Sequence, residues 1–179
     1  MKQFFLLIAL SAAFFSCNGN KKAEIVENGN MAMSATDGIA VFDLDGLLQV
    51  AGQEVDKTVK VVGYVTHTCK HSGKRCFIAG ESENASMRVE AKGEIGGFNR
   101  ELVGSKLEIT GILKERRLSK EYLDQMEQNV ELKRQEDASA ESCAAELSNI
   151  NDMRRRMKEQ DKEYFSIFYM DGLDYTVLD

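Results

Sequence analysis

Along the middle of the chain, hydrophobic and polar residues alternate with a period of two, which is typical of β-strands with one buried face. The alternation is clearest between positions 87 and 91, where Met87, Val89 and Ala91 alternate with Arg88 and Glu90. The same period, together with many β-branched residues, predicts three further strands. They cover Thr58–Lys70, Arg75–Ala79 and Lys106–Leu113.

In other segments the apolar residues recur every three or four positions, which is the period of an α-helix. The pattern predicts short helices over residues 41–51 and 96–102, and longer helices that begin near Ser119 and Glu141. A short connection joins the two longer helices, so they should form an antiparallel hairpin over about 119–162. Residues 163–170 predict a last strand, and 175–178 a short one after a turn at Asp171–Gly172.

The order of these elements predicts a mainly β fold with an α insertion. Five strands with a short helix between the third and the fourth are the layout of an OB-fold-like barrel, which closes on itself and so hides its edges. The helical hairpin would be inserted before the fifth strand. An open antiparallel sheet with helices on one side is the alternative.

The first 16 residues have the composition of a lipoprotein signal peptide. Lys2 precedes a short apolar run, and the small residue Ser16 stands directly before Cys17. The run is shorter than the roughly 20 residues that a spanning helix needs. We therefore expect cleavage before Cys17 and acylation of that cysteine, for example with palmitate, so that the membrane is a partner of the protein. A plain signal peptide, cut after Ala13 or Ser16, is the alternative.

Three segments follow from this interpretation: a signal peptide over 1–16, a lipidated cysteine with a flexible tether over 17–40, and an OB-fold domain over 41–179. The tether is polar and shows no periodicity. The expected location is the cell envelope, with the domain anchored to a membrane and facing the periplasm.

Composition and charge narrow the possible partners. The chain has 179 residues, 43% hydrophobic and 29% charged, which suits one globular domain with accessory segments. Its formal net charge is −6. Because an acidic protein repels phosphate backbones, nucleic acid is not the expected partner.

Both histidines and two of the four cysteines fall within ten residues: His67, Cys69, His71 and Cys76. Residues two apart on a strand share a face, so the first three should line up. A two-residue turn at Ser72–Gly73 would place Cys69 opposite Cys76. This face should point toward the mouth of the barrel, unless a bulge at Gly63 reverses it.

Three interpretations of this cluster remain open. In an oxidising compartment, Cys69 and Cys76 could form a disulfide. Alternatively, all four side chains could ligate Zn²⁺ or Cu⁺ as the cofactor, since two thiolates and two imidazoles suit either ion. In the third, the residues only pack or face solvent.

Basic residues surround the same turn. Lys70, Lys74 and Arg75 form a local positive patch that could bind an anionic ligand, or could only keep a strand edge soluble. Cys143 lies on an apolar helical stripe, so we expect a buried free thiol there, with pairing to Cys69 or Cys76 as the alternative.

The sequence resembles a family of OB-fold lipoproteins from Bacteroidetes-type bacteria. The resemblance covers roughly residues 40–179 and rests on the hairpin segment VTHTCKHSGKRCF at 65–77, on RVEA at 88–91, on GSK at 104–106 and on VVG at 61–63. It implies the OB fold and the envelope location. It implies no activity.

Together these features predict a non-enzymatic, lipid-anchored binding module whose site is the Cys/His hairpin. Its partner would be an envelope protein or a small ligand. One alternative is a structural or protein-interaction lipoprotein without a small ligand, and another is an OB-fold that binds single-stranded nucleic acid or an anionic ligand. A thiol redox enzyme is disfavoured because no C-x-x-C motif is present.

Overall fold

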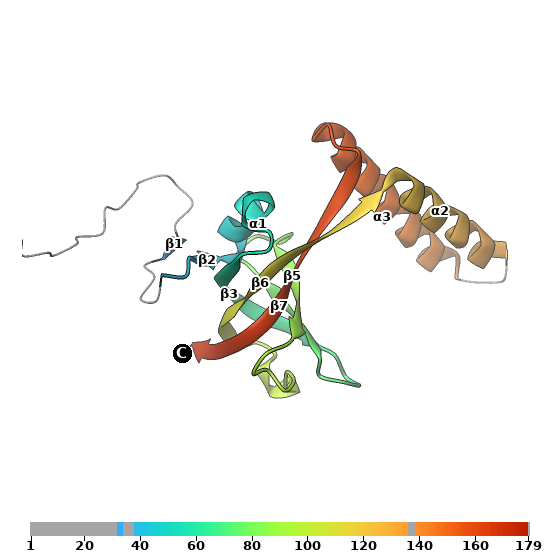
Figure 1. The fold of residues 1–179 in the computed structure, drawn as a ribbon. Coiled ribbons are helices and arrows are strands. Elements are labelled where there is room, and N and C mark those ends of the chain that lie inside the picture. Colours follow the sequence, from blue (N-terminus) through green and yellow to red (C-terminus); the bar gives the residue numbers. More distant parts are fainter. Residues whose placement is uncertain (1–31, 34–37, 136–138, 179) are drawn as a thin grey trace, which may run out of the picture.

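The structure is a computed structural model that describes residues 32–33, 38–135 and 139–178 (Figure 1). The elements in chain order are β1 (Ala32–Met33), β2 (Val41–Asp43), α1 (Leu44–Glu54), β3 (Thr58–Thr68), β4 (Arg75–Ala79), β5 (Ser86–Ala91), the 3₁₀ helix η1 (Arg100–Leu102), β6 (Lys106–Ser119), α2 (Lys120–Gln135), α3 (Ala140–Glu159) and β7 (Tyr164–Leu178).

Five strands close into a barrel. Hydrogen bonds join them in the order β3–β4–β5–β7–β6, and β6 returns to β3. Within this ring β5 and β7 run parallel and the other neighbours run antiparallel. The predicted mainly β, OB-fold-like barrel is therefore confirmed, and the open sheet is excluded.

Helix α1 contributes to the barrel core. Asp43 caps it, because the Asp43 Oδ1 accepts a hydrogen bond from the Gly46 N–H at 2.6 Å. Its apolar face, with Leu44, Leu47 and Ala51, is almost fully buried among the inward side chains of the strands. The sequence predicted a helix from 41, but residues 41–43 form β2, which pairs parallel to β3.

The connection between β5 and β6 contains less helix than predicted. The predicted helix over 96–102 is reduced to the three residues of η1. The two apolar residues of this segment nevertheless contact the core: Phe98 is buried in the barrel core, and Leu102 packs against that core.

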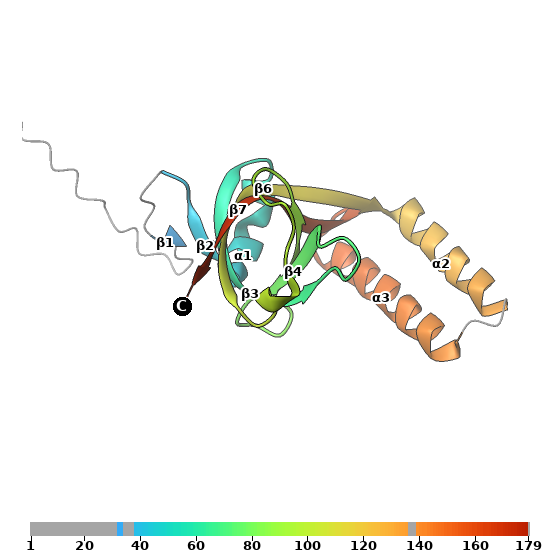
Figure 2. The same ribbon diagram turned by 90° about the horizontal axis from the view of Figure 1, so that it is seen from below.

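Strands β6 and β7 extend far beyond the barrel as a two-stranded ribbon (Figures 1 and 2). They pair from Lys106–Leu178 to Ser119–Tyr164. The predicted break in the last strand is wrong: β7 runs through Asp171 and Gly172, and the pairing shifts by one residue there instead of ending.

The helical hairpin sits at the far end of this ribbon, as Figures 1 and 2 show, and has a hydrophobic core of its own. Leu123, Val130, Cys143 and Ile150 are its most buried members, and Phe165 of the ribbon packs against it. The predicted insertion between the fourth and fifth barrel strands is thus present.

The signal peptide, Cys17 and most of the tether lie outside the described residues. Two parts of the predicted tether are described. Ala32–Met33 forms β1, which pairs antiparallel with β2, and the Ala40 carbonyl accepts a hydrogen bond from the Lys60 N–H at 2.8 Å. Residues 32–33 and Ala40 therefore add backbone hydrogen bonds to the sheet on the N-terminal side of residue 41. No helix within the described ranges is both long and apolar enough to cross a membrane.

The close approach of β6 and β7 at Gly111 gives a stability prediction. A Cβ at Gly111 would lie 2.6 Å from the Asp171 carbonyl oxygen and 2.6 Å from the Met170 Cγ. Because this site is enclosed, we expect Gly111→Ala to lower the free energy of unfolding by about 2–3 kcal/mol. Urea unfolding measures the change. The control is Gly52→Ala in α1, where an added Cβ has no neighbour within 4 Å. This substitution should raise the free energy of unfolding by about 0.5–1 kcal/mol. Equal effects of both substitutions would contradict the tight packing.

Candidate functional site

A bulge in β3 decides which side chains of the β3–β4 hairpin face outward. As far as Val65, the odd-numbered positions of β3 alternate into the core. The register then shifts between Val65 and His67, so β3 contains one extra residue. Beyond the shift Thr68 is buried, whereas His67 is exposed and lies opposite Phe77. Cys69 lines a cavity on this outer side together with His67.

The predicted hairpin register is therefore wrong by one residue. Thr68, not Cys69, lies opposite Cys76, and both of these side chains point into the core. Cys76 is 0% exposed. The expected position of Cys69 on the inner face, at the barrel mouth, is wrong for the same reason. A bulge was anticipated only at Gly63, which in fact continues the regular pairing with β6.

The loop between the strands is wider than the predicted two-residue turn. The Cys69 N–H donates to the Arg75 carbonyl at 2.9 Å, and the Gly73 N–H donates to the Cys69 carbonyl at 3.0 Å. The loop thus forms a short helical turn over 69–73. Gly73 has a φ of 61°, a left-handed conformation that glycine adopts without strain.

The β5–β6 connection supports this loop from the side. The Phe98 N–H donates to the Gly73 carbonyl at 2.7 Å, and the Lys74 Nζ donates to the Gly96 carbonyl at 2.6 Å. These bonds fix the loop conformation. They also explain why Lys74, a predicted member of the anionic-ligand patch, does not line the cavity.

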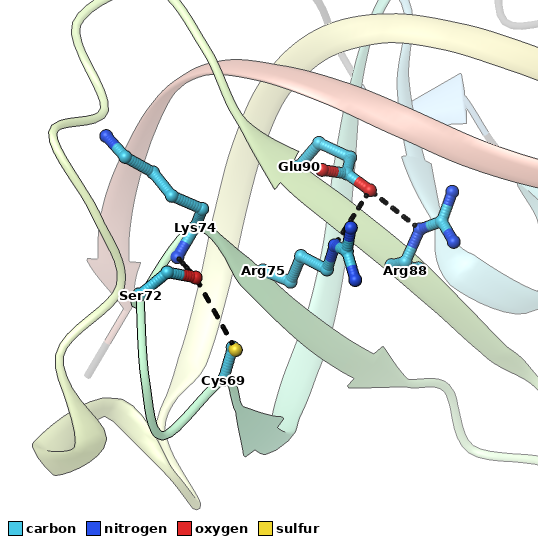
Figure 3. A network of polar contacts seen from close by, with 6 residues as sticks. All are labelled: Cys69, Ser72, Lys74, Arg75, Arg88 and Glu90. Carbon is cyan, nitrogen blue, oxygen red and sulfur yellow. Dashed lines mark hydrogen bonds and ion pairs between the residues drawn. The ribbon is translucent and has the colours of Figure 1, made fainter.

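Two basic residues on the outer face share one carboxylate (Figure 3). Arg75 of β4 lies opposite Glu90 of β5, and its Nε is 3.2 Å from the Glu90 Oε1. The Arg88 Nε is 3.1 Å from the same oxygen. Arg88 also stacks over the ring of its neighbour Tyr169, 5.0 Å from the centroid. The pair of guanidinium groups is therefore held in place but only half neutralised.

Arg75 and Arg88 are among the residues that line an open cavity of about 340 Å³ on the outside of the barrel. The residues that line it include imidazoles, a thiol, an aromatic ring and cations, and no carboxylate is among them. They are His67, Cys69, Lys70, His71, Arg75, Phe77 and Arg88. Glu90 contacts this group through its ion pairs with Arg75 and Arg88.

The Cys69 thiol is polarised by its loop. The Ser72 hydroxyl donates a hydrogen bond to the Cys69 Sγ at 3.5 Å (Figure 3). This bond, the backbone N–H groups of Ser72 and His71, and the positive charge of Arg75 lower the pKa of Cys69 to about 7. Near neutral pH a large fraction of Cys69 is therefore thiolate, the nucleophilic form.

The other described cysteines are shielded. Burial raises the pKa of Cys76 to about 12. Cys143 is buried in the core of the helical hairpin, as expected for a free thiol on an apolar stripe. Cys69, Cys76 and Cys143 are all free, so the structure contradicts the predicted Cys69–Cys76 disulfide and the alternative pairing of Cys143.

The predicted metal site is only partly assembled. His67, Cys69 and His71 line one cavity, but Cys76 lies on the other side of the sheet. In the described part of the chain no three His, Cys, Asp or Glu side chains are grouped so that they could hold a metal ion. The geometry gives no support to a Zn²⁺ or Cu⁺ centre.

Of the predicted anionic-ligand patch, Lys70 and Arg75 line the cavity. The predicted patch did not include Arg88 and Phe77, which also line the cavity. The alternation in the sequence already pointed Arg88 and Glu90 outward, but only the β4–β5 register places Arg88 opposite Phe77 and Glu90 opposite Arg75.

Comparisons with known proteins do not identify the chain. The sequence matches no protein-family model and no curated protein. Among solved structures, it is similar to a DUF3299 family protein from Pseudomonas aeruginosa PAO1, with 11% identity and a TM-score of 0.36, over 71% of this chain and 64% of the other. It is also similar to a putative aspartyl-tRNA synthetase from Leishmania major Friedlin, with 12% identity and a TM-score of 0.39, over 87% of this chain and 23% of the other. The chain thus spans less than two thirds of either structure.

The polarisation of Cys69 can be tested by removing its hydrogen-bond donor. In Ser72→Ala the pKa of Cys69 should rise toward that of an ordinary thiol, and alkylation of Cys69 by iodoacetamide at pH 7 should slow roughly threefold or more. Peptide mass spectrometry follows each cysteine separately across a pH series. Ser148→Ala, on the exposed face of α3, is the control and should leave the rate unchanged. Faster labelling of Cys76 than of Cys69 in the folded parent protein would contradict the assignment of faces.

Proposed function

We propose that this protein is a lipid-anchored, non-enzymatic binding module of the cell envelope, and that the cavity on its outer barrel face binds a small anionic ligand. The observation that carries the proposal is the charge of the cavity. Lys70, Arg75 and Arg88 line it without a carboxylate among the described lining residues, in a chain whose net charge is −6.

Hydrogen-bonding capacity supports an anion as the ligand. The ion pairs to Glu90 use the Nε of each guanidinium, so the terminal nitrogens of Arg75 and Arg88 can donate to a carboxylate or phosphate. One shared carboxylate leaves a net positive charge at this pair. Both arginines sit on paired strands rather than on loops, which fixes the relative positions of their backbones.

Phe77 supports an apolar or aromatic part in the ligand. Its side chain is 36% exposed in the middle of the sheet face, and its ring lies 6.0 Å from that of His67. An exposed ring beside cationic groups can stack on a flat ligand while the cations hold the charge. In OB-folds, this face of the second and third barrel strands and the first loop is a common binding surface.

Single-stranded nucleic acid is the second candidate. It is favoured by two exposed rings on the same face, Phe77 and Tyr64, with the Lys106 Nζ 5.1 Å from the centre of the Tyr64 ring. Bases stack on such rings while cations follow the backbone. The acidic net charge favours the small anion. Fluorescence anisotropy with a labelled oligothymidine separates the two candidates.

The ligand class can be tested with phenyl phosphate, and with benzyl alcohol as the uncharged probe. In an NMR titration, phenyl phosphate should shift the amide signals of residues 67–77 and 86–90, and benzyl alcohol should not at equal concentration. The double variant Arg75→Gln/Arg88→Gln should bind phenyl phosphate about tenfold more weakly or worse, since it loses charge-assisted hydrogen bonds.

The matched control is Arg134→Gln/Arg155→Gln, which makes the same change in net charge on the exposed faces of the helical hairpin. Its affinity should stay within about twofold of the parent. If both double variants lose affinity equally, the anion is attracted by overall charge and not by this cavity.

The membrane anchor rests on Cys17, outside the described residues. In a Gram-negative host fed with alkyne-labelled palmitate, the parent protein should carry the label and sediment with membranes. Cys17→Ser should lose both properties, because the two or more acyl chains needed for stable anchoring cannot be attached. Release of unlabelled parent protein into the soluble periplasm would instead support a plain signal peptide.

A further inference from the structure

We propose that the cavity captures anionic low-molecular-weight disulfides and forms a mixed disulfide with them at Cys69. This inference rests on the proposed anion-binding function, and it adds a covalent step and a substrate class to the same site. Several side chains of the cavity, and not Cys69 alone, support this step. A half-buried thiol, three cations and an aromatic ring line one cavity of about 340 Å³.

The position of the sulfur supports the attack. The Ser72 hydroxyl and the positive charge of Arg75 stabilise the thiolate, and Cys69 lines the cavity in which the ligand would lie. Lys70 and Arg88 line the same cavity. A disulfide with carboxylates at its ends can therefore place its charges on these cations while its sulfurs lie near Cys69.

The charged groups around Cys69 come from several elements. Lys70, His71 and Arg75 belong to its own hairpin, and His67 precedes it. The neighbouring strand β5 contributes Arg88 and Glu90, and β7 contributes Asp171 beside Glu90. Glu90 is tied to this group through its ion pairs with Arg75 and Arg88, which also line the cavity.

The exchange step balances without a further reagent. The Cys69 thiolate attacks one sulfur of the ligand R–S–S–R, a new Cys69–S–S–R bond forms, and the old S–S bond breaks. R–S⁻ leaves with the electron pair and takes a proton from water. Cys69 is oxidised to the mixed disulfide while one half of the ligand is reduced to a thiol.

The mixed disulfide should persist because no second thiol of the described chain can resolve it. Cys76 is nearest in the sequence, but it is 0% exposed on the opposite face of the sheet. Cys143 is buried in the separate core of the helical hairpin. Release therefore needs an external thiol, which makes the adduct reversible and dependent on the surrounding thiol concentration.

The test compares three disulfides in the full chain carrying Cys17→Ser, so that Cys17 adds no thiol. Oxidised glutathione is negatively charged, cystamine is positively charged and 2-hydroxyethyl disulfide is neutral. Adduct formation is followed by intact mass after an acid quench and is assigned by peptide mapping. Oxidised glutathione should react about tenfold faster than cystamine at low salt, against the net charge of the protein, and the ratio should fall as salt is added.

Variants separate attraction of the ligand from reactivity of the thiol. Arg75→Gln/Arg88→Gln should lower the ratio between oxidised glutathione and cystamine to about one or below. Rates for the neutral disulfide correct for any change in the thiol itself. Arg134→Gln/Arg155→Gln, with the same change in net charge, should keep the ratio of the parent. Cys69→Ser should form no adduct.

The same Cys69→Ser protein tells the two proposals apart. Suppose oxidised glutathione still shifts the amide signals of residues 67–77 in this variant, but the parent forms no adduct or reacts with all three disulfides at similar rates. The anion site then stands and the exchange proposal is overturned. Adducts mapped to Cys76 or Cys143 overturn it as well. If the parent forms no adduct and phenyl phosphate shifts none of these amide signals either, both proposals fall.

Discussion

The side chains that face outward from the β3–β4 hairpin depend on one extra residue in β3. In a strand, consecutive side chains alternate between faces, so a single inserted residue reverses every side chain beyond it. The shift between Val65 and His67 does this here. It turns His67 and Cys69 outward while Cys76 stays in the core. Without the shift, the Val65–Ile78 register would continue to a His67–Cys76 pair, and Cys69 would share the inner face with Cys76. With it, one thiol joins a row of cations at the surface.

The barrel could be predicted from the sequence because, in each strand, the alternation of apolar and polar residues indicates which face is buried. Alternation located β4 at Arg75–Ala79, and the run from Thr58 located β3. The site could not be predicted to the same depth, because it depends on register between strands. The bulge has no local signal: Thr66 and His67 fit a regular strand as well as a bulged one. Arg88 joins the cavity only through the pairing of β5 with β4, which a single sequence does not specify.

The domain contains two separate hydrophobic cores, one in the barrel and one in the helical hairpin. The barrel core includes α1: the pattern of apolar residues predicted this helix but not its packing against the barrel strands. The hairpin core lies at the end of the β6–β7 ribbon and shares no buried residue with the first. Because the cations and the thiol sit on β4, β5 and the loop after β3, the barrel alone positions them. The arrangement of the helical hairpin is therefore not a condition for the chemistry of the cavity.

The net charge of the chain is negative, whereas the charged side chains that line the cavity are positive. The distance over which each electrostatic field acts determines which ligands bind. At physiological salt, fields from exposed charges fade over about 8 Å. A small anion inside the cavity is within that distance of Arg75 and Arg88, which both form ion pairs with Glu90. A long polyanion would extend past the cations and meet a surface whose excess charge is negative, since the chain totals −6. Screening thus lets the cavity act locally, and it favours a small anion over a long polyanion.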